Sequence, residues 1–184
     1  ADVRIAHAAD AQPPELEPRF TCDGFVTNEP GVPLAVFMAD CLPVLLHDPI
    51  AGVIGAVHCG WRGSVADILG AAVAQMCALG AHPADIRAAI GPGIGACCFE
   101  VGPEVVSAAE ALLHAPLGAL ARPRADGKVL LDLKGVNARR LVQLGVPAGQ
   151  IAVSDACTMC RPDVFWSHRA TDGRRGVQAA VITL

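Results

Sequence analysis

Three short apolar runs in the first third of the chain limit the folds that it can adopt. They cover residues 34–38, 43–46 and 52–57. The second and third runs are joined by the turn-forming sequence His-Asp-Pro-Ile-Ala-Gly at residues 47–52, which predicts an antiparallel hairpin. A hairpin places Cys41, just before its first strand, near His58 at the end of its second strand. A thiol and an imidazole should therefore meet at the open end of this hairpin.

The rest of the chain alternates between strand and helix patterns. A helix is expected after Gly63, with Ser64 as its N-cap and Gly80 as its stop. A second helix should begin at Pro103, and a third should run from a cap at Asp132 to Gly145. Further strands are expected at residues 3–6, 24–27, 86–90, 128–131 and 151–154, with a buried strand at 177–184 and a loop-like segment at 10–18. This order, without a repeated strand–helix–strand unit, predicts a mixed sheet.

Length and charge exclude several classes of protein. The 184 residues fit one domain, and polar residues, glycine or proline interrupt every apolar run well short of the roughly 18 residues that span a bilayer. No charged leader precedes an apolar block, so we expect a cytoplasmic protein without a membrane partner. The net charge of −4 and the absence of a basic stripe argue against nucleic acid and favour a small ligand.

Cys41 and His58 form the sharpest candidate pair. A thiolate and a neutral imidazole are both zinc ligands, and they are also the nucleophile and base of cysteine hydrolases. It is equally consistent with the sequence that Cys41 is a small core residue and His58 a hydrogen-bonded strand end. Asp40 could orient His58 or accept a hydrogen bond from a substrate, or it could cap a turn.

Glycine-rich segments supply candidate anion contacts. Arg62 stands between Trp61 and Gly63 at a strand-to-helix junction, where it could bind an anion or simply stack on the tryptophan at the surface. The loop at residues 91–100 lacks dinucleotide-binding spacing, yet its glycines, including Gly93, could turn backbone N–H groups toward a ligand. Near the end of the chain, Arg169 could reach the pocket or lie at the surface.

The remaining cysteines offer weaker signals. Cys157 and Cys160 form a lone C-x-x-C pair, which needs two further ligands for a structural zinc site and lacks the helix of a redox motif. Cys97 and Cys98 are adjacent, so both are not expected to face one site. The sequence therefore predicts little metal or redox function here.

Four segments together resemble the laccase-domain polyphenol oxidase family. They are residues 39–46 (ADCLPVLL), 58–63 (HCGWRG), 90–102 (IGPGIG followed by CFEVG) and 157–169 (CTMCRPDVFWSHR). Members are also described as purine nucleoside phosphorylases, and some bacterial ones as peptidoglycan editing factors. The resemblance covers nearly the whole chain. It implies one laccase-like domain over residues 1–184 with an α+β fold, mixed β-sheets flanked by helices, similar to the cytotoxic-factor and YfiH-like cysteine-hydrolase fold.

The family's metal site, usually zinc and alternatively copper, uses two histidines and one cysteine. Cys41 and His58 match two of these ligands. The other histidine belongs to a QVHG-like motif that in the family lies just ahead of the position of Ala1, and His7 does not match it. The resemblance therefore implies a domain that is incomplete at its N-terminus.

A metal-dependent purine nucleoside phosphorylase with adenosine deaminase activity is the implied function, with a purine nucleoside and phosphate as substrates. In this interpretation Cys41, His58, Asp40 and Arg62 are catalytic. Phosphate or substrate is bound by four residues: Arg62, Gly63, Gly93 and Arg169. Two alternatives stay open. Cys41 and His58 could act without metal as a hydrolase that edits peptidoglycan precursors, or the domain could be a non-catalytic binding module if the third ligand is absent.

Overall fold

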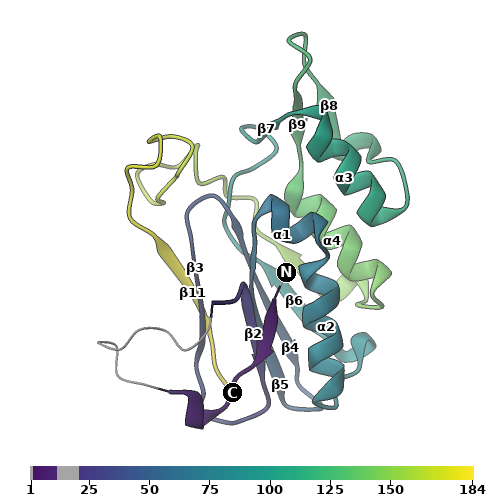
Figure 1. Cartoon of the computed structure of the whole chain (residues 1–184), viewed down its shortest axis with the longest axis vertical. Coiled ribbons are helices and arrows are strands. Elements are labelled where there is room, and N and C mark those ends of the chain that lie inside the picture. Colours follow the sequence, from purple (N-terminus) through teal and green to yellow (C-terminus); the bar gives the residue numbers. More distant parts are fainter. Residues whose placement is uncertain (1, 12–20) are drawn as a thin grey trace.

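The computed structural model describes residues 2–11 and 21–184, so most of the loop expected at 10–18 lies outside the described residues. Its centre is a six-stranded sheet with the order β1-β2-β5-β4-β6-β10 (Figure 1). The strands are β1 (Val3–Ile5), β2 (Gly24–Thr27), β4 (Leu42–Asp48), β5 (Val53–Cys59), β6 (Arg87–Ile90) and β10 (Ile151–Val153). The two outer pairs, β1–β2 and β6–β10, are parallel and the inner pairs are antiparallel. The predicted mixed sheet is therefore confirmed.

The hairpin of β4 and β5 forms as its turn sequence predicts. Pro43 pairs with His58 across the two strands. Asp48 holds the turn, because its Oδ1 accepts hydrogen bonds from the backbone N–H groups of Ile50 and Ala51 and its Oδ2 accepts one from His82 at 2.8 Å. Burial favours the neutral carboxyl, but these backbone donors outweigh it and lower the pKa of Asp48.

The six-stranded sheet is covered differently on its two faces. Helices lie on one face: α1 (Trp61–Val65), α2 (Ile68–Ala78) and α4 (Leu133–Gln143) contact its strands, and α3 (Pro103–Leu113) packs against α1 and α4. The other face carries a two-stranded antiparallel sheet of β3 (Leu34–Met38) and β11 (Gln178–Ile182), seen beside each other in Figure 1. Alternation along β5 serves both layers, since Val57 and Cys59 pack with the helices while Ile54 and Ala56 pack with β3 and β11.

A smaller three-stranded sheet stands beside α3 at one end of the molecule (Figure 1). Its strands are β7 (Glu100–Val101), β8 (Ala121–Pro123) and β9 (Val129–Leu131), in the order β7-β9-β8. Four short 3-10 turns complete the described structure: η1 (Ala8–Asp10), η2 (Pro83–Asp85), η3 (Gly118–Leu120) and η4 (Ala148–Gln150). Among the described residues, no helix combines the length and apolar character needed to cross a bilayer.

Two of the expected helix starts are confirmed and one is wrong. Pro103 opens α3, and the Asp132 carboxylate caps α4 by accepting from the backbone N–H of Gly135 at 3.0 Å. Ser64, however, lies inside α1, because the expected helix after Gly63 is split in two. Asp67 adopts a left-handed φ of 58° at the break and caps α2, and Arg140 binds its carboxylate through two N–H groups at 2.8 and 2.7 Å.

The last strand also departs from its prediction. β11 was expected to be buried, yet its side chains alternate between partly buried and exposed, and Val181 is 56% exposed. The reason is that β11 belongs to a two-stranded sheet whose outer face meets solvent, so only every second side chain reaches the core.

Candidate functional site

Cys41 and His58 face one another across the open end of the hairpin. The Cys41 thiol stands just before β4, and His58 is the penultimate residue of β5. A Cβ atom built on Gly60 would lie 3.1 Å from Cys41 Sγ and 3.6 Å from His58 Nε2. Both atoms therefore border the same small space, which exists because residue 60 has no side chain.

A carbonyl group fixes the orientation of the His58 ring. Nδ1 lies 3.0 Å from the carbonyl oxygen of Phe37 in β3. A carbonyl can only accept, so Nδ1 is the donor in this hydrogen bond and Nε2 is turned toward the space beside Gly60. Ligating histidines in metal sites are commonly held by this type of hydrogen bond. A hollow of about 300 Å³ between β2 and β3 is lined by His58 together with Cys22 and Asp23.

The Cys41 thiol is protonated in the absence of a metal. Burial raises its pKa, the Asp40 carboxylate raises it further, and the Arg175 guanidinium partly opposes both effects. A bound cation would reverse this balance, because it would favour the thiolate directly.

Asp40 holds the turn on which Cys41 sits. Its φ is 80°, in the left-handed region, and its carboxylate is buried. Oδ1 accepts from the hydroxyl of Thr158 at 2.6 Å, and Oδ2 accepts from the backbone N–H of Arg169 at 2.7 Å. The carbonyl of Phe37, and not Asp40, orients the His58 ring. The Asp40 carboxylate instead acts as a clamp, because it joins this turn to the C-terminal segment.

The predicted anion-binding residues differ in burial and in their contacts. The exposed Arg62 guanidinium stacks on the Trp61 ring at 4.4 Å, and Gly63 follows it inside the short helix α1. Gly93 is buried directly against the turn, since a Cβ there would lie 2.8 Å from the carbonyl oxygen of Asp40. The Arg169 side chain donates to the carbonyl of Glu100 at 3.2 Å.

Arg175 is a residue near the site that sequence reasoning missed. Its guanidinium lowers the pKa of the Cys41 thiol, against the larger effects of burial and of Asp40. Its Nε is buried and, within the described part of the chain, has no hydrogen-bond partner, although Nη2 lies 3.4 Å from His168 Nδ1. Its sequence context, a turn between Gly173 and Gly176, gave no sign of this position.

The metal-ligand set at the pair holds two donors. Among residues 2–11 and 21–184, no third His, Cys, Asp or Glu side chain joins Cys41 and His58 in a metal-binding group. His7 instead pairs with Glu29, with 2.6 Å between Nδ1 and Oε1. The two donors have the chemistry and the shared space of a metal site, and a third would complete it.

Four other cysteines form a second candidate metal centre, contrary to our expectation. The Sγ atoms of Cys97, Cys98, Cys157 and Cys160 all lie within 4.8 Å of one another, so the group could hold a metal. The adjacent Cys97 and Cys98 do face one site, because they lie in a turn rather than a strand and neighbouring side chains are not sent to opposite faces.

The thiols of this cluster differ in acidity. Burial acts to raise the pKa of Cys157, but hydrogen bonds from the backbone of Gly95 and Cys160 outweigh it and lower that pKa to about 7. Burial and the neighbouring thiols raise the pKa of Cys97 and Cys98. By contrast, Cys59 is fully buried, and burial raises its pKa, which agrees with a packing role.

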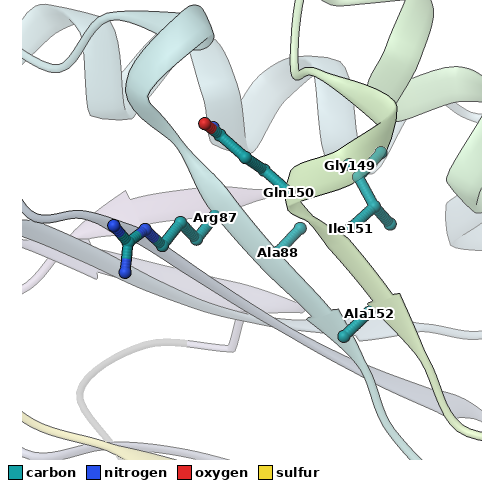
Figure 2. Close-up of a pocket in the computed structure, with 6 residues that line it drawn as sticks. All are labelled: Arg87, Ala88, Gly149, Gln150, Ile151 and Ala152. Carbon is teal, nitrogen blue, oxygen red and sulfur yellow. The ribbon is translucent and has the colours of Figure 1, made fainter.

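A larger hollow lies elsewhere, at the edge of the sheet between β6 and β10 (Figure 2). It measures about 530 Å³ and is lined by Arg87, Ala88 and residues 149–152. Figure 2 shows the Arg87 side chain extending away from Gly149 and Ile151. Arg87 is the only charged group in its lining, so this hollow lacks the convergent polar groups of a reaction site.

The fold and the Cys–His pair define a class: an α+β domain in which a thiol and an imidazole share one site at the end of a hairpin. The chain belongs to the family whose model is described as multi-copper polyphenol oxidoreductase laccase, which matches residues 1–184. The resemblance found in the sequence and the α+β fold class are thereby confirmed.

Relatives of the chain are named as enzymes. It is 40% identical over 162 residues to purine nucleoside phosphorylase YlmD of Geobacillus stearothermophilus, covering 87% of this chain and 59% of that protein. It is 42% identical over 147 residues to adenosine deaminase RL5 of an unknown prokaryotic organism, covering 80% of this chain and 56% of RL5. The chain thus spans less than two thirds of the length of these relatives.

The fold is also that of a solved structure in the family. The crystal structure of YlmD from Geobacillus stearothermophilus superposes with a TM-score of 0.90 at 36% identity, covering all of this chain and 69% of that one. The confirmed family membership covers every described element, including the hairpin that carries Cys41 and His58.

Proposed function

We propose that this chain carries the Cys–His part of a zinc-dependent purine nucleoside phosphorylase that also deaminates adenosine. The names of the relatives support this assignment, and so does the α+β frame that the chain shares with them. The substrates are a purine nucleoside with phosphate in one reaction and adenosine with water in the other. A cytoplasmic location stays a prediction.

One observation carries the proposal: Cys41 Sγ and His58 Nε2 border the same space, with the ring held by the Phe37 carbonyl. Together with the histidine of the predicted QVHG-like motif, they would make the three-ligand set of a catalytic zinc site. Bound zinc would supply a Lewis acid that brings the pKa of a water molecule near neutrality. Copper is the alternative metal, since imidazole and thiolate also suit it.

The other predicted site residues have separate roles in this proposal. Stacking on Trp61 holds the Arg62 guanidinium by its face and leaves the N–H edge able to bind phosphate. Gly63 lies against the backbone of His58, and Gly93 and the backbone N–H of Arg169 lie against Asp40, so we assign phosphate or substrate contacts to these three residues. Asp40 is a positioning residue, and the Arg175 charge stabilises the Cys41 thiolate.

The state of Cys41 favours metal binding over the hydrolase alternative. A cysteine nucleophile works as a thiolate and is usually found with a lowered pKa. Here burial raises the pKa of the Cys41 thiol. This thiol would lose its proton when it binds a metal, whereas the metal-free pair is a weak nucleophile and base couple.

The test compares cysteine variants of the protein expressed from its whole gene. Cys41→Ala should lower both phosphorolysis of inosine and deamination of adenosine at least 100-fold, because losing a ligand exceeds the roughly 10–100-fold cost of losing a residue that hydrogen-bonds to a ligand. Cys77→Ala is the matched control, since Cys77 is an exposed thiol on α2. Metal analysis of both variants identifies zinc or copper. Unchanged nucleoside turnover in Cys41→Ala would refute the proposal.

A further inference from the structure

The cluster of Cys97, Cys98, Cys157 and Cys160 is a candidate metal-binding group separate from the pair of Cys41 and His58. We propose that these four thiolates bind one zinc ion in a structural site that fastens the loop at residues 91–100 to the segment at 155–170. The proposal does not depend on the metal at Cys41 and His58, and the two sites can be tested separately.

The distances between the sulfur atoms fit a single tetrahedral ion. A Zn–S bond of about 2.3 Å in a tetrahedron places the sulfurs roughly 3.8 Å apart. Here Cys160 Sγ lies 3.5 Å from Cys97 Sγ and 3.4 Å from Cys98 Sγ, and the largest separation in the group is below 4.8 Å. A disulfide needs about 2.05 Å, and Cys160 cannot bond to both neighbours. A cluster of several irons would force the four sulfurs farther apart.

The backbone around Cys157 is arranged for a metal-bound thiolate. The N–H of Gly95 donates to Cys157 Sγ at 3.2 Å, and Gly93 and Cys157 form a parallel β-bridge that brings the two segments together. A Cβ on Gly95 would lie 3.1 Å from the Cβ of Cys157 and 3.3 Å from Cys97 Sγ, so glycine permits this close approach. Backbone donors to thiolate sulfur are a recurring means of stabilising charge in metal sites.

A buried lysine offsets the negative charge of the proposed centre. Four thiolates around one divalent zinc carry a net charge of −2. Lys134 is 6% exposed, and its ammonium donates to the carbonyls of Ser154 at 2.8 Å and Ala156 at 2.7 Å, directly before Cys157. Burial lowers the pKa of Lys134, and Cys157, Asp132, Asp155 and Cys97 act in the opposite direction. An anionic centre at Cys157 would give this buried cation a further counter-charge.

The two segments joined by the cluster also hold the turn of the candidate active site. The N–H of Ile94 donates to the carbonyl of Asp40 at 2.8 Å, and the hydroxyl of Thr158 donates to the Asp40 carboxylate. The Thr158 N–H donates to the carbonyl of Gly93 at 3.1 Å. A zinc ion at the four cysteines would therefore stabilise the position of Cys41 from a distance, without touching substrate.

The first test measures metal content in matched serine variants. Cys160→Ser should hold one zinc fewer per chain than the parent protein, whereas Cys77→Ser should hold the same amount as the parent. Cys41→Ala should keep the zinc of the four-cysteine site, so the failure of one site is distinguishable from the failure of the other. Zinc content that is equal in Cys160→Ser and the parent overturns the proposal.

The second test uses the unmutated chain, so that it stands even if a variant does not fold. In the zinc-loaded protein the exposed thiols of Cys97 and Cys160 should alkylate about tenfold or more slowly than exposed Cys77, and a chelator should remove most of this difference. Cobalt added to the metal-free protein should give the intense visible absorption of a tetrahedral thiolate complex. Equal alkylation rates, a disulfide within the cluster, or iron in place of zinc would each overturn the assignment.

Discussion

Replacing Asp40 with alanine should destabilise the whole domain, because this carboxylate joins two segments that lie 129 positions apart in the sequence. Two charge-assisted hydrogen bonds are lost, each worth about 1.5–3 kcal/mol, and the buried Thr158 loses its acceptor. At a φ of 80° alanine is about 1 kcal/mol less favourable than aspartate, whose short polar side chain is better tolerated in the left-handed region. Since such contributions overlap, we expect the free energy of unfolding to fall by about 3–5 kcal/mol.

Two further variants separate the hydrogen bonds from the strain. Asp40→Gly removes the same carboxylate but relieves the left-handed backbone, so it should be about 1 kcal/mol more stable than Asp40→Ala. Thr158→Val should remove one of the two bonds and cost about half as much as Asp40→Ala. Asp163→Ala is the control, because Asp163 is exposed and its ion pair with Arg161 should contribute less than about 1 kcal/mol.

Urea unfolding followed by tryptophan fluorescence and by circular dichroism measures all four changes. Coincident transitions from both probes justify a two-state free energy. If Asp40→Ala unfolds within about 0.5 kcal/mol of the parent, the clamp does not hold these segments together. If Asp40→Gly is as unstable as Asp40→Ala, the strain assigned to the left-handed φ is wrong.

Two more predictions concern the hairpin. Gly60→Ala should slow alkylation of Cys41 several-fold with less than about 1 kcal/mol lost in stability, because the new Cβ would contact the thiol at 3.1 Å; Gly149→Ala, whose Cβ meets nothing within 4 Å, should change neither quantity. An unchanged alkylation rate in Gly60→Ala would contradict the shared space. The pKa of Asp48 is lowered by folding, so its contribution to stability is complete above about pH 4–5 and is lost as the pH falls through the folded value. Urea midpoints from pH 7 to pH 3 should therefore decline more steeply in the parent than in Asp48→Asn, and parallel curves would refute this linkage.

Local sequence signals predicted the parts of the fold that local interactions determine. The turn at residues 47–52 defined the hairpin, and Asp132 and Pro103 marked helix starts, because capping and proline geometry act within one turn of helix. The same reasoning failed at Ser64. The break there depends on the long-range contact of Arg140 with Asp67, 73 positions away, and no local pattern encodes such a contact.

The four-cysteine cluster shows the same limit at the level of a site. Cys97 and Cys160 are 63 positions apart, and only the crossing of two loops brings them together. The sequence did hold one usable signal for this site, which was the number of cysteines. Two lie in one glycine-rich loop and two more have C-x-x-C spacing, so together they make up the four ligands of a metal site. Cys41 and His58 were predictable because one hairpin joins them, whereas Arg175 reaches Cys41 through the tertiary fold alone.

The pairing of β3 with β11 also sets the order in which this domain can be completed. β3 ends at Met38, and its hydrogen-bonding partner begins only at Gln178. At a synthesis rate of about 5–20 residues per second, the interval between them takes roughly 7–30 s, during which β3 has an unpaired edge. The hairpin of β4 and β5 can form early, but the Phe37 carbonyl that orients His58 lies on β3, which is still unpaired at that stage. On the ribosome, the candidate reaction site should therefore be among the last features of the domain to become ordered.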